Sequence, residues 1–327
     1  MNPAISRRAR SSVPAVDPLV SVIIASHNRE QMLSRAVTAV AAQDLAGEYE
    51  LVVIDDASTD GTPDRMLRLL DEATIPVTYL RLEANSGPAV GRNAGLAVAR
   101  GRFIAFTDDD CVQSPGWLGA ALEAFQSPKT GMVQGRTLPA RPTSSFLSRH
   151  VETRGVDGTF ATANIVYRRE ALEGQLFDPA CSWGQWEDMD LGWRVLEQGW
   201  EVCFAPEALV RHEVLPMTRT QWVMWPWHYF VWCANTARHP GFRRHLFLGL
   251  WVRPMHLLMD LAVAGLLASR WLRSAALLVL PYAVAFVRIH NVRGRNFFTR
   301  VLLYLARDAV AFVCLRLGSV RHRAVVL

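Results

Sequence analysis

Short apolar runs alternate with stretches of helical periodicity over roughly the first third of the chain. The apolar runs are 19–26 (LVSVIIAS), 49–56 (YELVVIDD), 76–82 (PVTYLRL) and 102–110 (RFIAFTDDD). The helical patterns between them are RAVTAVAAQ, PDRMLRLLDEA and PAVGRNAGLAVA. Continuous apolar runs are typical of strands that are buried on both faces, and their alternation with helices indicates β-α-β units. The pattern therefore predicts an α/β fold with a mostly parallel sheet.

The pattern becomes less regular after residue 111. The stretch 114–125 (SPGWLGAALEAF) predicts a helix that Ser114 and Pro115 open, because Pro is favoured in the first turn. The stretch 158–172 (GTFATANIVYRREAL) predicts a strand and the start of a helix. A further helix is expected from about Trp186, and 201–212 (EVCFAPEALVRH) predicts a pair of short strands that end at His212.

Polar clusters follow three of the predicted strands. They are Ser26-His27-Asn28, Asp55-Asp56 and Asp108-Asp109-Asp110. In an open parallel sheet the carboxyl ends of the strands share one edge, which is where ligands bind. Two carboxylates about 4 Å apart repel each other by roughly 4 kcal/mol near a protein surface. The triple acid is therefore expected to hold a hard divalent cation, Mn²⁺ or Mg²⁺, whose open positions bind phosphate oxygens.

Beyond Pro216 the composition shifts to aromatic and long apolar segments. From Arg211 onward sixteen Arg and no Lys stand against three acids, a balance of +13, so the first 210 residues carry −8 of the net +5. Six Trp and apolar runs at 246–269 and 274–287 are interleaved with these Arg residues. This pattern is typical of a membrane–water interface, although buried helices of a soluble domain could share it, and it does not suit nucleic-acid binding.

The predicted organisation has four parts. They are a disordered, Arg-containing arm over 1–17, an α/β domain over 18–213, an aromatic interfacial linker over 214–245 and a hydrophobic, helical, membrane-associated region over 246–327. The arm lacks the apolar core of a secretory signal. The five cysteines show no C-x-x-C pair, which indicates free thiols in a reducing compartment. The α/β domain is therefore expected to be cytosolic.

Several motifs, in order from about Val20 to His212, resemble those of the inverting family 2 glycosyltransferases. They are VSVIIASHNRE, VVIDDASTDGT, NSGPAVGRNAG, FTDDD, ATANIVYRRE, WEDMDLGWR and VRHE. The resemblance implies a GT-A fold, a Rossmann-like and mostly parallel sheet that binds a nucleotide sugar, with a metal at the D-x-D motif. His27 departs from the Tyr that relatives often carry against the base, and Ala25 departs from Pro or Thr.

The resemblance also implies roles for individual residues. Asp110 and His212 would bind the metal, Asp108 would meet the ribose and Asp56 would recognise the base. The other residues expected to contact the nucleotide sugar are Ala25, His27, Asn28, Arg92, Asp109, Asn164, Arg168 and Trp186.

A catalytic base is expected at the acidic pair Glu187-Asp188. An inverting transfer needs a base that takes the proton from the attacking hydroxyl. The pair opens a predicted helix beside Trp183 and Trp186, where partial desolvation would raise the pKa of Asp188 toward a useful range. Asp188 is therefore the expected base, with Glu187 and Asp190 as rivals.

The sequence thus predicts a metal-dependent hexosyltransferase at a membrane. Its expected partners are a nucleotide-diphosphate sugar, with UDP favoured over GDP and TDP, a hydroxyl of a glycan or lipid-linked acceptor, and membrane lipids, but no nucleic acid. One alternative is a polyprenyl-phosphate sugar transferase of the same fold, whose acceptor is already an anion. A sugar nucleotidylyltransferase normally has a Gly- and Arg-rich loop with a Lys, whereas this chain has one Lys, Lys129, and no such loop. The last alternative is a catalytically inactive membrane scaffold.

Overall fold

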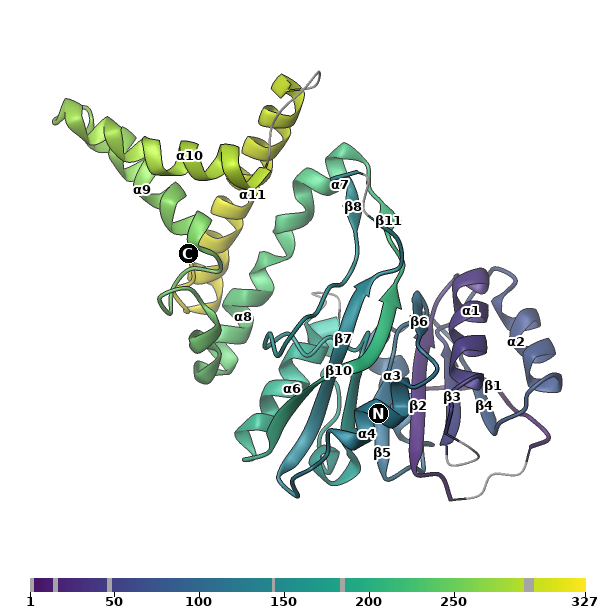
Figure 1. The fold of residues 1–327 in the computed structure, drawn as a ribbon. Helices are drawn as coiled ribbons and strands as arrows, with labels where there is room; N and C mark the ends of the chain where they lie inside the picture. The colour runs from purple at the N-terminus through teal and green to yellow at the C-terminus, as the bar shows by residue number, and fades with distance from the viewer. Residues whose placement is uncertain (1–2, 14–16, 46–48, 143–144, 183–185, 291–296) are drawn as a thin grey trace. The chain divides into compact units, whose positions relative to one another are not determined.

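The protein divides into two compact units, Met1–Leu215 and Pro216–Leu327, and each is described by itself. The computed structural model describes residues 3–13, 17–45, 49–142, 145–182, 186–290 and 297–327. Figure 1 shows the strands of the large sheet in the first unit and a set of helices in the second. The division falls close to residue 213, where the sequence predicts the end of the α/β domain.

The first unit is built on one sheet. Among the described residues, its nine strands run in the order β1-β4-β3-β2-β5-β9-β7-β10-β6. Its parallel half consists of β2 (Val20–Ser26), β3 (Tyr49–Asp55), β4 (Val77–Leu82) and β5 (Phe103–Phe106). The side chains of β3 are all buried and those of β2 nearly all, as expected of strands that are covered on both faces. The predicted mostly parallel α/β sheet is confirmed.

The other half of the sheet mixes strand directions. β9 (Ile165–Arg168) runs antiparallel between β5 and β7 (Thr130–Pro139), and β10 (Glu201–His212) runs parallel to β7. The short strand β6 (Cys111–Gln113) pairs antiparallel with the end of β10. The carboxyl ends of β2, β3, β5, β7 and β10 therefore lie at one edge of the sheet, and β6 begins at that edge.

Residues 201–212 form one strand and not the predicted pair of short strands. The register of β10 against β7 shifts between Ala205 and Leu209, so the residues between them bulge out of the ladder. Pro206 lies in this bulge, because its missing N–H cannot take part in regular pairing. The break in the apolar pattern reflects this irregularity and not the end of a strand.

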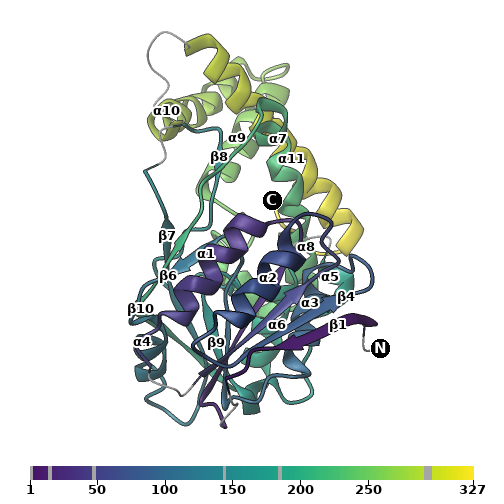
Figure 2. The same cartoon turned by 90° about the vertical axis from the view of Figure 1, so that its right-hand side faces the viewer.

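Helices cover both faces of the sheet (Figure 2). α1 (Glu30–Ala41), α2 (Thr62–Asp71) and α4 (Trp117–Glu123) contribute buried side chains to the main core with Val22 and Ile24. Since side chains alternate along a strand, Ile23 faces the opposite side. α3 (Pro88–Leu96) lies on that side, where a Cβ at Gly95 would come within 2.6 Å of the Ile23 side chain. The glycine therefore permits the close approach of α3 to the sheet.

The remaining elements of the first unit pack around the mixed half of the sheet. The rings of Trp193 in α6 and Phe160 pack with their centroids 6.0 Å apart, and Phe177 meets Phe106 of β5 edge-on at 5.1 Å. These elements are α5 (Pro179–Ser182), α6 (Glu187–Glu197), the 3-10 turn η1 (Arg169–Leu172) and the short pair β8 (Ser148–Arg149) and β11 (Leu215–Pro216).

The predicted disordered arm over 1–17 is wrong for its central part. Residues Ile5–Arg10 form β1, which pairs antiparallel with β4 at the edge of the sheet, and Ser11 exchanges side-chain hydrogen bonds with Val77 and Ile75. Most side chains of β1 are exposed, so the segment has no apolar pattern. Backbone hydrogen bonds to β4 stabilise β1 instead, and such bonds cannot be recognised from the hydropathy of the sequence.

The described part of the second unit consists mainly of helices. Trp222 meets Tyr304 edge-on at 4.9 Å, and the thiol of Cys233 lies 3.6 Å from the Leu315 carbonyl. The segment 214–245, predicted as a linker, therefore packs against the last helix of the same unit. The helical elements are α7 (Arg219–Met224), η2 (Trp225–Tyr229), α8 (Phe230–Arg238), η3 (Pro240–His245), α9 (Pro254–Ala268), η4 (Arg273–Leu278), α10 (Val279–His290) and α11 (Phe297–His322).

One stretch of the second unit has the length and composition of a membrane span. The 18 residues Arg273–His290 cover η4 and α10, have a mean hydropathy of 1.3 and bury little of their surface. The apolar helix α9 is shorter. Among the described residues this is the one helix that meets both conditions.

Asn164 links three parts of the mixed half of the sheet through hydrogen bonds of its side-chain amide. Its amide accepts a hydrogen bond from Trp117 Nε1 at 2.8 Å and donates to the carbonyls of Arg136 (3.0 Å) and Ala208 (2.8 Å). Because Asn164→Ala leaves these buried groups unpaired, it should lower the free energy of unfolding by about 2–4 kcal/mol in urea titrations. Gln126→Ala, at an exposed loop amide, should change it by less than about 0.5 kcal/mol. Equal effects of the two substitutions would contradict this role.

Candidate active site

Charged side chains converge at the carboxyl edge of the sheet. They come from the loops after β2 and β5, from α3, from the start of α6 and from the end of β10. The contacts described below link them into two adjoining groups, one around Arg29 and one around Arg92.

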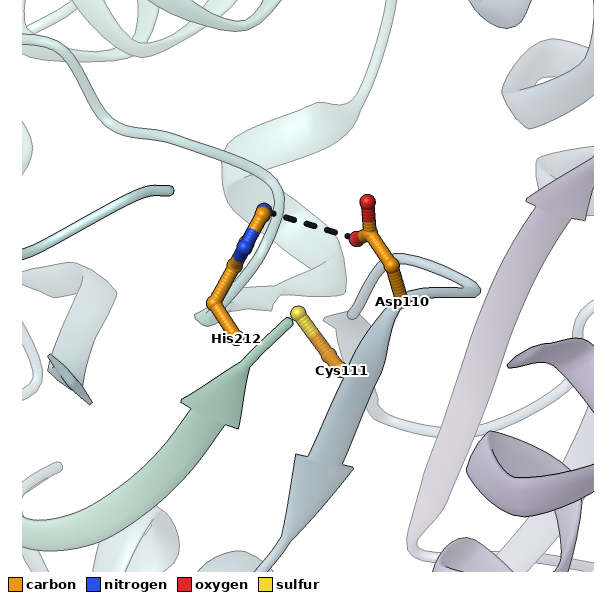
Figure 3. Close-up of side chains that lie close together, drawn as sticks. All are labelled: Asp110, Cys111 and His212. Carbon is orange, nitrogen blue, oxygen red and sulfur yellow. Dashed lines mark ion pairs between the residues drawn. The ribbon is translucent and has the colours of Figure 1, made fainter. Parts of the chain in front are cut away.

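The pairing of β6 with β10 brings Asp110 and His212 together (Figure 3). His212 lies directly opposite Cys111 in this register, and Asp110 precedes Cys111. The Nε2 atom of His212 lies 3.4 Å from Oδ1 of Asp110. The potential ligand atoms of Asp110, Cys111 and His212 all lie within 4.8 Å of one another. Two segments that are about a hundred residues apart thus form one cluster.

This cluster has the donor set of a divalent-metal site. The Nδ1 atom of His212 lies 2.7 Å from the carbonyl of Glu213, which can only accept, so Nδ1 donates to it and Nε2 is the ring nitrogen that faces Asp110. Such a backbone contact orients many metal-binding histidines. Burial and the nearby carboxylates of Asp108 and Asp110 raise the pKa of the Cys111 thiol well above its ordinary value. A hard cation such as Mn²⁺ prefers oxygen and imidazole ligands to a thiol, so Asp110 and His212 are the candidate ligands of this cluster.

Arg29 balances the charge of two of the three adjacent acids. Its guanidinium lies 2.8 Å from Oδ1 of Asp109 and 2.9 Å from Oδ2 of Asp110. Ser26 donates to the other oxygen of Asp109 at 2.6 Å. Burial raises the pKa of Asp109 to about 6, with Arg29 opposing the shift and Asp110 adding to it. The sequence analysis missed Arg29, although three adjacent acids at a strand end signal the need for a nearby cation.

Arg92 connects the D-x-D motif to the acidic pair of α6. Its guanidinium lies 3.0 Å from Asp108 and 2.8 Å from Oε1 of Glu187, and it stacks over the ring of Phe177 at 5.6 Å. Burial alone would lower the pKa of Arg92, but Asp108 and Glu187 raise it above its ordinary value. Oε2 of Glu187 is buried and has no hydrogen-bond partner among the described residues. Glu187 therefore anchors Arg92 through one oxygen.

Asp188 is half-buried at the first turn of α6, next to this ion pair. Its Oδ1 accepts from the N–H of Met189 at 2.8 Å and its Oδ2 from the N–H of Thr162 at 3.3 Å. The hydroxyl of Thr162 lies 3.4 Å from Asp108, so one residue contacts both acids. Burial, reinforced by the charge of Glu187 and opposed by Arg92, raises the pKa of Asp188 to about 8. The predicted direction of this shift agrees with the structure.

The other candidates around the start of α6 are arranged differently. Asp190 is buried and forms an ion pair with Arg194, one turn along the helix, at 2.9 Å. That contact gives it a structural role. Trp186 is the half-buried residue that precedes the first turn of α6. Trp183 lies outside the described residues.

The residues predicted to recognise the nucleobase lie at the ends of β2 and β3. The carboxylate of Asp56 accepts from the N–H groups of Ser86 and Gly87, both at 2.8 Å, and so binds the loop that starts α3. Burial raises the pKa of Asp56, which these hydrogen bonds oppose. The ring of His27 lies 2.7 Å from the Asp56 carbonyl.

Asn28 and Ala25 shape this end of the sheet. Asn28 has a left-handed backbone (φ 55°), and its side chain accepts from the N–H of Thr59 at 2.7 Å. It thereby connects the loops after β2 and β3. Ala25 is partly exposed, and a Cβ at Gly91 of α3 would lie 3.3 Å from its methyl group. A larger residue than Ala would therefore crowd α3.

Of the two predicted sugar-binding residues, Asn164 lies at this edge with its amide turned into the core, and Arg168 lies at the far end of β9. Asn164 is only 2% exposed, and its amide is engaged by the protein core through the three hydrogen bonds given above. Arg168 pairs with Phe103, at the opposite end of β5 from Asp108, and donates to the Thr130 carbonyl at 3.1 Å. The motif ATANIVYRRE did not reveal this, because β9 runs antiparallel to β5 and carries its last residue away from the site.

Two sequence profiles match the chain. One, described as "Glycosyl transferase family group 2", matches residues 103–290, which is more than half of the chain. The other, described as "Glycosyl transferase family 2", matches residues 21–182.

Curated proteins and a solved structure are also similar. An uncharacterized glycosyltransferase of Nostoc sp. is 31% identical over 184 residues, 52% of this chain and 56% of its own length. The succinoglycan biosynthesis protein ExoO of Rhizobium meliloti is 29% identical over 201 residues, 53% of this chain and 55% of its own length. The chain thus spans about half the length of these relatives.

The structure of the mannosyltransferase PcManGT from Pyrobaculum calidifontis, in complex with GDP-Man and Mn²⁺, superposes with a TM-score of 0.65. It is 21% identical, and the match covers 93% of this chain and 89% of that one, which confirms the GT-A fold. With the fold and the matched profiles in agreement, the chain belongs to the family 2 glycosyltransferases.

Proposed function

We propose that the protein is an inverting glycosyltransferase that moves a sugar from a nucleotide-diphosphate sugar to a hydroxyl of a glycan or lipid-linked acceptor. The observation that carries this proposal is the contact of Thr162 with both Asp108 and Asp188. It places a carboxylate of raised pKa beside the D-x-D motif. A donor-binding group and a proton acceptor are thus within reach of one bound sugar.

Asp188 is the proposed base. A carboxylate with a pKa of about 8 holds a proton more tightly than an ordinary Asp, so it accepts the proton of an attacking hydroxyl more readily. The Met189 and Thr162 N–H groups hold its two oxygens in place. Glu187 instead keeps Arg92 fixed against Asp108. Asp188 therefore removes the proton while Glu187 and Arg92 maintain the shape of the site.

Asp110 and His212 are the proposed ligands of a divalent cation, Mn²⁺ or Mg²⁺. The donor set and the fixed tautomer of His212 fit this role. When bound, the cation supplies positive charge that stabilises the departing diphosphate. Asp108 is proposed to bind the ribose, and Arg29 holds Asp110 in position.

The loops after β2 and β3 are the proposed nucleobase site, with His27, Asn28 and Asp56 at its base. UDP is the proposed nucleotide. The similar Escherichia coli protein WfgD, 38% identical over 107 residues, is named as a UDP-Glc-dependent glucosyltransferase acting on a diphosphoundecaprenol-linked sugar. That match covers 33% of this chain and 39% of the relative. Thermal-shift measurements with UDP-, GDP- and TDP-sugars and Mn²⁺ distinguish the nucleotides.

The second unit is proposed to attach the enzyme to the cytosolic face of a membrane. The apolar stretch Arg273–His290 and exposed apolar side chains such as Leu280 (56%) and Val284 (49%) support this attachment. The net +13 from Arg211 onward favours a surface of anionic headgroups. A lipid-linked acceptor would then reach the enzyme within the plane of the membrane.

Asp188→Asn tests the base. The amide keeps the shape but cannot accept the proton, so kcat should fall by about 10²–10⁴ while donor affinity stays near that of the wild type. In the wild-type enzyme kcat/KM should rise with pH up to about 8, because protonated Asp188 is inactive below its pKa. In the variant, kcat/KM should no longer rise with pH in this range. If the variant kept more than about a tenth of the wild-type kcat, the role of base would move to Glu187. Inactivation by Asp188→Asn would argue against an acceptor that is already an anion, because such an acceptor needs no base.

Asp110→Ala tests the metal. Because Asp110 is the proposed carboxylate ligand, the variant should lose Mn²⁺-dependent UDP binding in calorimetric titrations and should lose turnover. The matched control Cys111→Ala removes a soft thiol that a hard cation disfavours, so it should retain Mn²⁺-dependent binding. Full turnover in excess EDTA would contradict a metal-dependent mechanism.

Membrane fractionation tests the attachment. We expect the full-length protein to sediment with membranes. Electrostatic contacts with the membrane surface contribute about 1 kcal/mol per basic residue and are screened by salt, whereas the burial of an inserted helix is not screened. Release of the protein by high salt therefore means peripheral binding. Retention in alkaline carbonate means that helices are inserted. Leu280→Asp with Val284→Asp, both exposed on α10, should weaken retention. A fully soluble wild-type protein would disprove membrane attachment.

A further inference from the structure

Positively charged residues greatly outnumber negatively charged ones in the second unit. Residues 216–327 contain fifteen Arg but only two acids, Asp260 and Asp308. Asp260 forms an ion pair with Arg316. The carboxylate of Asp308 accepts a hydrogen bond from the hydroxyl of Tyr282 at 2.7 Å. Both acids are thus engaged, so most of the arginines have no carboxylate of their own unit to pair with.

Arg253 and Arg307 are two arginines that form no ion pair with any described residue. Arg253 is exposed and directly precedes α9, and Arg307 is half-buried on α11. The guanidinium of Arg307 donates to the carbonyl of Trp222 at 3.2 Å and lies 4.2 Å from the centroid of its ring. Burial lowers the pKa of Arg307, an effect that Tyr229 opposes and Arg253 reinforces. The two guanidiniums are therefore close enough for their charges to interact.

Tyr229 and His256 add polar groups at the same place. The ring of Tyr229, in η2, lies 5.7 Å from the ring of His256, in the first turn of α9. η2 also packs against α11, the helix that carries Arg307. His256 is 7% exposed, and within the described part of the chain its Nδ1 atom has no hydrogen-bond partner. Burial lowers the pKa of His256 to about 4, and the charge of Arg253 adds to this shift. The imidazole is therefore neutral near pH 7 and lies in a region of positive charge.

The start of α9 is itself favourable for an anion. The helix has 15 residues and no acidic residue in its first turn, and Arg253, which precedes it, makes no side-chain capping hydrogen bond. The first N–H groups of a helix and its dipole attract negative charge, and phosphate groups often bind there. Groups from η2, α9 and α11 thus combine with the positive end of a helix.

The number and charge of these groups indicate the chemistry of the ligand. A neutral sugar would leave the charges of Arg253 and Arg307 unbalanced. A carboxylate offers two acceptor oxygens and one negative charge. A phosphate monoester offers three acceptor oxygens and a charge of about −1.5 to −2 at neutral pH, and guanidinium groups bind it through two parallel hydrogen bonds. A phosphate monoester therefore matches two guanidiniums, a hydroxyl and an imidazole better than a carboxylate does.

We propose that Arg253, Arg307, Tyr229 and His256 form a phosphate-binding site at the start of α9. Its ligand is a terminal phosphate group, which either a lipid headgroup or a free phosphate ion supplies. The site goes beyond the proposed function, since it requires neither a nucleotide sugar nor transfer of the sugar. It adds a specific contact to the general attraction that the net positive charge exerts on anionic surfaces.

Calorimetric titration of the full-length protein in neutral detergent micelles tests the site. The first probe is dioctanoyl phosphatidic acid, which carries a phosphate monoester. The comparison probe is dioctanoylglycerol succinate, which has the same chains and a carboxylate in place of the phosphate. We expect phosphatidic acid to bind about tenfold more tightly, because it makes at least one additional charge-assisted hydrogen bond. General attraction of basic residues would give the two lipids similar affinities.

Three variants separate the site from the overall charge. Arg253→Gln should weaken binding of phosphatidic acid by about tenfold. Arg307→Lys keeps the charge but removes the planar guanidinium, so it should weaken binding several-fold. The matched control is Arg321→Gln, which removes the same charge from an exposed position about 21 Å further along α11. It should bind like the wild type, and all three variants should keep the thermal unfolding temperature of the wild type.

Inorganic phosphate, in a phosphate-free buffer, distinguishes the two sources of the ligand. If it competes with phosphatidic acid for the wild type and not for Arg253→Gln, the site binds the free ion as well as the headgroup. If only phosphatidic acid binds, the ligand is a lipid phosphate. Equal affinities for phosphatidic acid and the succinate lipid would overturn the proposal. So would equal losses in Arg253→Gln and Arg321→Gln, or no binding of either phosphate probe.

Discussion

Crowding of carboxylates at one edge of the sheet is the constraint on which the site depends. Asp108, Asp109, Asp110, Glu187 and Asp188 meet there, and at short range like charges disfavour one another strongly. Arg29 and Arg92 make this arrangement stable, since each bridges two acids at 2.8–3.0 Å. Burial, to which the neighbouring acids add, raises the pKa of Asp109 and of Asp188. The same crowding that must be balanced for folding gives Asp188, the proposed base, its raised pKa.

The scaffold holds these groups by backbone contacts. Two N–H groups of the loop before α3 hold Asp56, two other N–H groups hold Asp188, and a carbonyl orients His212. Gly95 lets α3 lie close to the sheet, on the face where Arg92 meets Asp108. Sites on rigid elements with supported side chains need little rearrangement when a ligand binds. These side chains are therefore held in place by the protein itself, which suits the proposed binding of a nucleotide sugar at this edge.

The second unit differs from the first in exposing many large apolar side chains. Its outer helices leave large apolar side chains exposed, whereas the polar residues Tyr282 and Asp308 pair with each other inside it. In water such a surface is costly, and beside lipid it is favourable. The cluster of charged side chains and the exposed apolar surface thus occupy separate compact units of one chain. This division suits a reaction that joins a water-soluble sugar donor to an acceptor held in a membrane.

The sequence by itself determined the parallel half of the sheet, the acidic strand ends and the identity of the proposed base. These features are local, because buried strands and strand-end acids appear as short runs of one residue type. Tertiary structure alone decided that β6 pairs with β10 to join Asp110 to His212, and that Arg29 and Arg92 are the counter-cations. It also decided that Asn164 lies in the core and that Arg168 lies at the far end of the sheet. β1 and the packed segment 214–245 escaped prediction for the same reason. Backbone pairing, strand direction and contacts between distant segments leave no periodic signal in the chain, so only the folded arrangement reveals which side chains meet.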